Sequence, residues 1–249
     1  MPPSPAKIHC RLVDFHDWVY YGILTLFKLD PLETAKYILK NVSLYILLCI
    51  ATFLMLRGIV RYYPMQDNVG FLQFKQDYIH ILPWKIAFYT HVFTIILALL
   101  AGFTQFSNYI LKEYRSIHRT MGKIYVFDVL FLNFPAAMIM AIYANGLLPA
   151  KTAFVVLDCL WFLFTYKALV EARKKNIKAH KQYMIRSYAL TLSAVTLRLW
   201  KIIISAFVYI DPLHLYMIDA WMGFVPNLLF AEWLIRRNIN NPRILSFKS

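Results

Sequence analysis

The stretch that decides the fold is Ile124–Tyr143, which reads IYVFDVLFLNFPAAMIMAIY. Its only charged residue is Asp128. A helix of about 20 apolar residues is long enough to cross a hydrocarbon core of roughly 30 Å. This stretch therefore predicts a transmembrane helix, and the rest of the chain can be read outward from it.

Similar stretches recur on both sides. Hydrophobic residues make up 60% of the chain and charged residues only 16%, against roughly 45–50% and about 25% in soluble domains. We therefore expect an all-α polytopic membrane helical bundle of about six transmembrane helices. The shorter apolar segment Trp18–Phe27 predicts an N-terminal helix that lies in the membrane interface. The six predicted spans are Ser43–Val60, Ile86–Phe106, Ile124–Tyr143, Thr152–Leu169, Tyr183–Val208 and Leu215–Ile235.

Positive charge alternates between the connections, and this predicts the orientation. Four segments are rich in Lys and Arg, whereas the connections between them carry few, so by the positive-inside rule both termini are cytoplasmic. The chain then divides into an N-terminal cytoplasmic and interfacial segment (1–41), a six-span membrane domain (42–237) and a cytoplasmic tail (238–249). The net charge of +14 fits cytoplasmic loops and anionic lipid, and without a basic soluble domain we expect no nucleic-acid partner. The basic residues are Lys7, Arg11, Lys28, Lys36 and Lys40; Lys112, Arg115, Arg119 and Lys123; Lys167, Arg173, Lys174, Lys175, Lys178 and Lys181; and Arg236, Arg237, Arg243 and Lys248.

Five ionisable residues from four predicted spans share one depth toward the outer side. They are His91, Asp158, Arg198, Lys201 and Asp219. Charged groups inside a bilayer usually face the bundle interior. We expect the two cations to neutralise the two aspartates. Two interpretations stay open: structural ion pairs that hold the helices together, or an outer pocket for a cofactor, metal or substrate.

A second polar layer is predicted near the cytoplasmic face. His118 and His180 occupy equivalent positions, each at the inner entrance to a span. Arg119 follows the first histidine, and Arg186 and Glu232 are plausible partners across the helices. Further out along the chain, Asn227 follows Pro226, where its side chain is expected to bond a carbonyl freed by a proline kink.

The motifs of the C-terminal two thirds resemble a family of bacterial membrane proteins, domain of unknown function 2306. The resemblance runs from about His91 to Arg237, with Tyr183 where the family usually has Trp. It implies a helical protein of the bacterial inner membrane, and it suggests a motif set of His118, Arg119, His180, Arg186, Arg198, Asn227 and Glu232. The matching pieces are Gln105-Phe106, the run HRTMGKIY at 118–125, Trp161, the run HKQYMIRSYALT at 180–191, Arg198, Trp221, the run PNL at 226–228 and the run EWLIRR at 232–237.

Several functions follow as hypotheses. Histidines near both faces resemble, in layout, the two-haem membrane cytochromes of the b561 kind. That layout favours haem b, with His118, His180 or His91 as ligands of the iron. Arg119 or Arg186 would form ion pairs with the haem propionates. The function would then be electron transfer. The alternatives are a transporter or small-molecule binding protein, an intramembrane enzyme or metal protein, and a non-catalytic subunit or assembly factor of a membrane complex. No HExxH, GxSxG or Walker motif occurs, and the sequence leaves open whether the protein is an enzyme. The expected partners are the lipid bilayer and subunits of a membrane complex.

Overall fold

A computed structural model describes residues 31–240. Helices make up most of this part of the chain, and it contains no strand. The all-α class is thereby confirmed. The predicted interfacial helix Trp18–Phe27 and residues 241–249 of the predicted tail lie outside the described residues.

Contacts divide the chain into two units after Leu47. In the first unit the described residues, 31–47, form the first part of helix α2 (Pro31–Val60). In the second unit α2 continues to Val60, and all the other helices follow. Everything described below belongs to this second unit.

Three helices of the second unit are long and apolar enough to cross a membrane. They coincide with the predicted spans Ile86–Phe106, Ile124–Tyr143 and Thr152–Leu169, which are thereby confirmed as membrane-length helices. The second of the three is a single path made of three consecutive segments. The three are α3 (Leu82–Gln105), the path α5 (Arg115–Phe127), η2 (Asp128–Asn133) and α6 (Phe134–Ile142), and α7 (Leu147–Arg173).

The count of six is not confirmed. The predicted span Ser43–Val60 lies in the single helix α2, but only its part Tyr45–Val60 is a described apolar helix, and it is shorter than membrane length. The last two predicted spans are not single straight helices. Tyr183–Val208 is divided between α8 (Ile177–Thr191) and α9 (Ser193–Phe207), which meet at 44° and make a fourth crossing only if counted as one. Leu215–Ile235 is divided between two helices of 11 and 16 residues. At about 1.5 Å per residue each is too short to cross alone. These last two are α10 (Pro212–Met222) and α11 (Val225–Asn240).

Side-chain chemistry explains both breaks. No proline or glycine stands at the α8–α9 bend; instead the Ser193 hydroxyl donates to the Leu190 carbonyl, and the Thr196 hydroxyl donates to the Leu192 carbonyl at 3.2 Å. Hydroxyls that bond the backbone in this way bend helices. At the α10–α11 break, Pro226 has no N–H to continue the ladder. Asn227 Nδ2 donates to the Gly223 carbonyl at 3.2 Å, as expected for an amide beside a proline kink.

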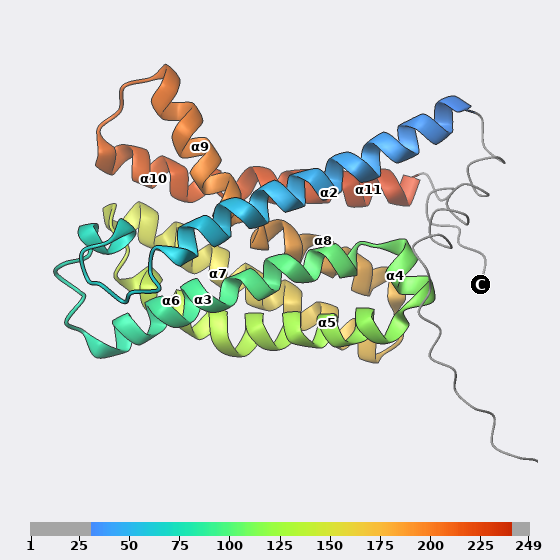
Figure 1. Ribbon diagram of the computed structural model, residues 1–249, viewed down its shortest axis with the longest axis horizontal. Helices are drawn as coiled ribbons and strands as arrows, with labels where there is room; N and C mark the ends of the chain where they lie inside the picture. The colour runs from blue at the N-terminus through green and yellow to red at the C-terminus, as the bar shows by residue number, and fades with distance from the viewer. Residues whose placement is uncertain (1–30, 241–249) are drawn as a thin grey trace, which may run out of the picture. The chain divides into compact units, whose positions relative to one another are not determined.

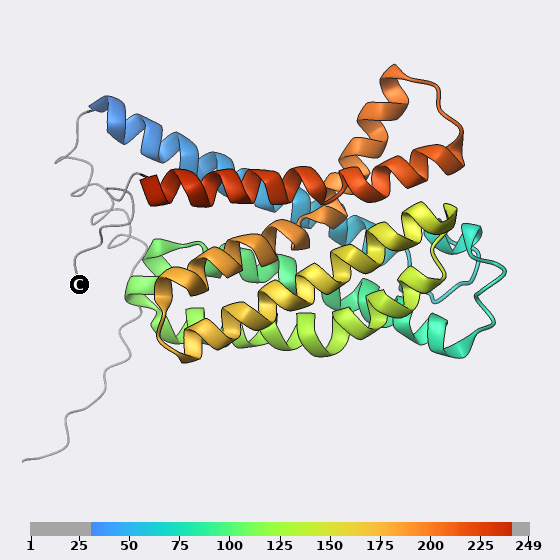
Figure 2. The ribbon, with the colours of Figure 1, turned by 180° about the vertical axis from the view of Figure 1, so that it is seen from behind.

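Four helical segments lie side by side and enclose the core: α3, the α5–α6 path, α7 and α8 (Figure 1). Seen from behind, α7 and α8 run next to each other, and α11 lies against α8 (Figure 2). Tyr125, Trp161 and Tyr188 are the large side chains of the core, joined by Ile95 and Leu99. The short helix α4 (Asn108–Glu113) connects α3 to α5.

A buried lysine fixes the loop that precedes α3. Lys75 follows the short helix η1 (Gly70–Phe74) and is only 2% exposed. Its Nζ donates to Asn145 Oδ1 at 2.7 Å and to the Tyr143 carbonyl, and it lies over the rings of Phe71 and Tyr78. Burial, with the charge of a neighbouring lysine, lowers the pKa of Lys75 to about 8. The lysine thereby ties the loop to the α6–α7 connection.

Candidate functional site

The turn η2 interrupts the second membrane helix with a wider, π-helical winding. Pro135, in the first turn of α6, has no N–H to donate to the Phe131 carbonyl, so an α-helical turn cannot close there. In a π turn, residues five apart share a face. That winding brings Asp128 and Asn133 together, and π turns of this kind are frequent at functional sites.

Hydrogen bonds join this turn to α3. Asn133 Nδ2 donates to Asp128 Oδ1 at 2.9 Å and to Thr94 Oγ1 at 3.0 Å. His91 stands one turn from Thr94 on α3, with its imidazole near the Asn133 side chain. We call His91, Thr94, Asp128 and Asn133 the Asp128 cluster.

Three buried polar atoms of the Asp128 cluster find no hydrogen-bond partner within residues 31–240. They are Asp128 Oδ2, Asn133 Oδ1 and His91 Nδ1. Asp128 is 1% exposed, and no ion pair reaches it from the described part of the chain. An unsatisfied buried polar atom costs about 1–3 kcal/mol, and a carboxylate in hydrocarbon costs at least ~2.5–3.5 kcal/mol. The cluster is therefore equipped to take up a proton or a small polar ligand.

A hydroxyl network occupies the core next to the Asp128 cluster. Tyr125 Oη lies 2.6 Å from Ser187 Oγ and 2.8 Å from Thr191 Oγ1. Ser187 Oγ is also 2.6 Å from Thr165 Oγ1, and Trp161 Nε1 donates to Thr191 Oγ1 at 3.1 Å. These five side chains come from α5, α7 and α8, and all five are buried. The network ties three helices together through polar groups that hydrocarbon cannot satisfy.

The two polar sets adjoin along one helix. Tyr125 and Asp128 are three residues apart, so their side chains leave the same side of the α5–η2 path. The hydroxyl network extends from Tyr125 to Trp161 and Thr165 on α7 and to Ser187 and Thr191 on α8. The Asp128 cluster extends the other way, toward His91. The core thus contains two adjoining sets of polar groups, which together we call the polar file.

The predicted inner histidines are each held by a main-chain carbonyl. His118 Nδ1 donates to the Thr104 carbonyl at 3.5 Å, and His180 Nδ1 donates to the Ala168 carbonyl at 2.8 Å. Both side chains are partly buried, and the two rings are close enough for their charges to interact. Arg119, in contrast, is exposed. An Nδ1–H so engaged leaves Nε2 as the free nitrogen of the neutral ring, an arrangement typical of metal-binding histidines.

The predicted partnership of Arg186 with Glu232 is present. Two parallel contacts join them, with Arg186 Nη2 donating to Glu232 Oε2 at 3.0 Å and Nε donating to Oε1. The guanidinium also lies 5.4 Å from the Tyr183 ring centre and 5.9 Å from that of Phe164. This pair connects α8 to α11.

The predicted outer charge cluster does not assemble into ion pairs. Asp158 and Asp219 are buried, yet no salt bridge joins either of them to a cation of residues 31–240. Arg198 donates instead to the Ala194 carbonyl on its own helix, and both Arg198 and Lys201 are exposed. The charge of Lys201 acts on Asp219 only from a distance. The expectation failed because equal depth along two helices does not set the direction in which their side chains point.

Asn227 has a structural role. Besides the Gly223 carbonyl, its amide donates to the Ala189 carbonyl at 3.1 Å and to Thr196 Oγ1 at 2.9 Å. Its hydrogen bonds therefore connect α11 to the α8–α9 bend. No group of three or more His, Cys, Asp or Glu side chains within the described residues could hold a metal ion.

Sequence reasoning missed the hydroxyl network as a site. Tyr125, Ser187 and Thr191 all lie inside the motif runs at 118–125 and 180–191, and Ser187 and Thr191 are four residues apart on one helix face. That spacing was the available signal. Uncharged hydroxyls hardly change a hydropathy profile, which is why they escaped attention.

Comparison with known proteins gives one match. No curated protein and no solved structure matches the chain. A family model described as "Predicted membrane protein (DUF2306)" matches residues 88–235, more than half of the chain and the same region as the motifs. The matched region includes the Asp128 cluster, the hydroxyl network and the Arg186–Glu232 pair. The chain therefore belongs to the DUF2306 family of predicted membrane proteins.

Proposed function

We propose that this membrane protein transfers protons through its helical core, with Asp128 as the protonation site inside the membrane. The observation that carries the proposal is a buried carboxyl with an unpaired oxygen, placed one helical turn from a continuous hydroxyl network. Ionisable groups within membrane helices mark proton and ion pathways. The function is thus of the transporter class rather than that of a soluble enzyme.

The hydroxyl network has the properties of a relay. In the bonds from Tyr125 to Ser187, from Tyr125 to Thr191 and from Thr165 to Ser187, either oxygen can be the donor. Each hydroxyl can accept a proton on one side while it releases its own on the other, so the bonds reverse direction and no covalent bond to carbon changes. Trp161 only donates, so it orients the network without relaying.

Proton flux into proteoliposomes tests the proposal. Reconstituted protein is given a potassium diffusion potential, and a trapped pH dye reports the internal pH. Asp128→Asn keeps the shape of the side chain and removes its proton chemistry, so flux should fall about 100-fold, as for loss of a general acid–base group. Asp158→Asn is the matched control, because Asp158 is also a buried acid of a membrane helix but belongs to neither polar set; its flux should stay at the wild-type level.

Either of two outcomes overturns the proposal. Flux that Asp128→Asn leaves unchanged excludes the Asp128 cluster. Flux that is lost in Asp158→Asn but kept in Asp128→Asn assigns the transport pathway to the outer charge cluster instead. If the wild-type protein carries no flux and instead copurifies with a larger membrane complex, the polar file is structural and the protein is a subunit or assembly factor.

A topology of six crossings accompanies the proposal. It counts α2 as the first crossing and the bent pairs α8–α9 and α10–α11 as the fifth and sixth, with both termini on the cytoplasmic side of the bacterial inner membrane. The alternation of basic connections supports it. A single cysteine substituted for Lys112 or for Lys178 should react with an impermeant maleimide only from the cytoplasmic side. A single cysteine substituted for Asp67 should react only from the outer side.

Haem-mediated electron transfer is a second candidate, favoured by the inner histidines. Their Nδ1 contacts with the Thr104 and Ala168 carbonyls leave two Nε2 atoms free to bind iron. A Soret band in protein purified from haem-replete cells should disappear in His118→Ala and His180→Ala and persist in His214→Ala, whose side chain is exposed. A featureless spectrum of folded protein removes this candidate.

A further inference from the structure

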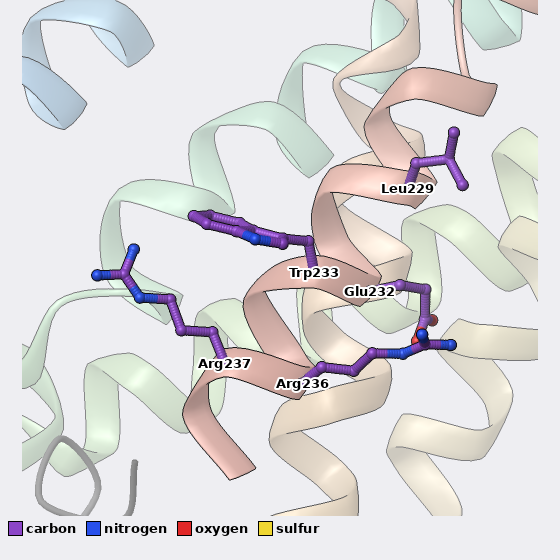
Figure 3. A pocket seen from close by; sticks show the side chains of 5 residues that line it. All are labelled: Leu229, Glu232, Trp233, Arg236 and Arg237. Atoms are coloured by element: carbon purple, nitrogen blue, oxygen red, sulfur yellow. The ribbon is translucent and has the colours of Figure 1, made fainter. Parts of the chain in front are cut away.

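One face of α11 forms a shallow hollow that neither polar set of the core uses. Five residues line it, at the spacing i, i+3, i+4, i+7 and i+8, so they make one continuous stripe along the helix. The hollow has a volume of about 410 Å³ (Figure 3). We call it the α11 stripe; its residues are Leu229, Glu232, Trp233, Arg236 and Arg237.

The stripe changes from apolar to basic along the helix. At its first end Leu229 is 66% exposed, and at its middle Trp233 is 51% exposed and stacks on Phe230. At its last end both Arg236 and Arg237 are exposed. From Leu229 to Arg236 is seven residues, or about 10 Å along the axis at 1.5 Å per residue. An apolar end, a tryptophan and then two arginines is the order met on passing from hydrocarbon through the interface to the headgroups.

The net charge of the stripe is positive in spite of Glu232. That carboxylate is already paired, through two contacts, with Arg186 from α8. Arg236 extends toward the same carboxylate, whereas Arg237 points to the other side of the stripe and is left to act on a ligand (Figure 3). Arg237 is also oriented, because its guanidinium lies 5.3 Å from the centre of the Trp233 ring. A planar guanidinium held in this way suits bidentate binding of a phosphate.

We infer that the α11 stripe binds an anionic phospholipid, with its phosphate on Arg237, the positive charge of Arg236 adding to the attraction, and an acyl chain along Trp233 and Leu229. Charge complementarity selects an anion, and the exposed apolar end selects a ligand with a hydrocarbon chain. Because the Arg186–Glu232 pair supports the stripe from behind, a bound lipid would also reinforce the contact between α11 and α8. This inference does not depend on proton transfer.

Fluorescence quenching by brominated lipid tests the inference. The protein in neutral detergent micelles is titrated with dibrominated phosphatidylglycerol or with dibrominated phosphatidylcholine. The Trp233 signal is obtained as the difference from Trp233→Phe. Phosphatidylglycerol should quench it at far lower mole fractions than phosphatidylcholine. In Arg236→Gln/Arg237→Gln the apparent affinity for phosphatidylglycerol should fall about thirtyfold, from two basic side chains near a lipid surface.

A matched variant removes the same charge elsewhere. Arg173→Gln/Lys178→Gln neutralises two exposed basic residues, one at the end of α7 and one at the start of α8, and should leave the quenching unchanged. Equal quenching by the two lipids overturns the inference, as does an equal loss of affinity in both double variants. Displacement of the brominated lipid by millimolar glycerol phosphate also overturns it, because the ligand would then be a soluble phosphate.

Discussion

Removing one hydroxyl at the centre of the hydroxyl network should have a measurable and bounded cost. In Tyr125→Phe the ring stays and only Oη is lost, together with its bonds of 2.6 Å to Ser187 and 2.8 Å to Thr191 and a longer one of 3.4 Å from Trp161 Nε1. Neither partner becomes unsatisfied, since Ser187 keeps Thr165 and Thr191 keeps Trp161. Trp161 Nε1 likewise keeps its bond to Thr191. The loss is therefore two short membrane hydrogen bonds and one long, weak one, without a desolvation penalty. Side-chain bonds in membranes average about 0.6 kcal/mol and reach about 1.7, which gives about 1–3 kcal/mol.

The assay is reversible unfolding in mixed micelles of sodium dodecyl sulfate and dodecyl maltoside, followed by tryptophan fluorescence. Tyr166→Phe is the control: it removes the same atom from an exposed tyrosine of α7 and should change the free energy of unfolding by less than about 0.5 kcal/mol. A double-mutant cycle with Ser187→Ala should give a coupling of about 0.6–1.7 kcal/mol. A Tyr125→Phe cost equal to that of Tyr166→Phe, or a cycle with no coupling, refutes the reasoning.

Two further predictions concern other parts of the second unit. Gly102→Ala would place Cβ 1.9 Å from Tyr188 Oη and disturb its bond to the Leu99 carbonyl, so the same unfolding assay should show a loss of about 1–3 kcal/mol; Gly58→Ala, with no heavy atom within 4 Å, should be neutral or stabilising. Burial lowers the pKa of Lys75 to about 8, so above that pH the unfolded chain binds the extra proton and the free energy of unfolding should rise with pH up to the ordinary lysine pKa of about 10.4. Thermal melting of Lys75→Met should lack this rise, and equal slopes in both proteins would contradict the assignment.

Sequence reasoning predicted the parts of the fold that depend on composition. Apolar length gave the three membrane-length helices, and the motif runs gave the family. The bend between α8 and α9 escaped because hydropathy reads Tyr183–Val208 as one stretch. Its cause is the way the hydroxyls of Ser193 and Thr196 bond the backbone. A hydropathy profile contains no information on such bonds.

The candidate site was predicted only in part, for a related reason. Rise per residue gives the depth of a side chain in the membrane, but not its rotation about the helix axis. Arg186 and Glu232 share both depth and direction, and they pair. Asp158 and Arg198 were assigned the same depth, yet they do not pair. Asp128 and Asn133 meet only because the helix winds more widely between them, and no periodicity of 3.6 would bring residues five apart together.

The π turn at Asp128–Asn133 also has a consequence for how the site can vary during evolution. A π turn holds one residue more than an α turn, so deleting one residue there would let the segment continue as an ordinary α-helix, and the faces of α5 and α6 would stay nearly in register. Composition, apolar length and the basic connections would all stay nearly as they are. A single in-frame codon deletion between Asp128 and Asn133 would therefore leave a chain that still inserts as a membrane protein and in which the two residues, now four apart, share one face of an α-helix. Such related chains are recognised by a gap in the alignment, not by a changed residue.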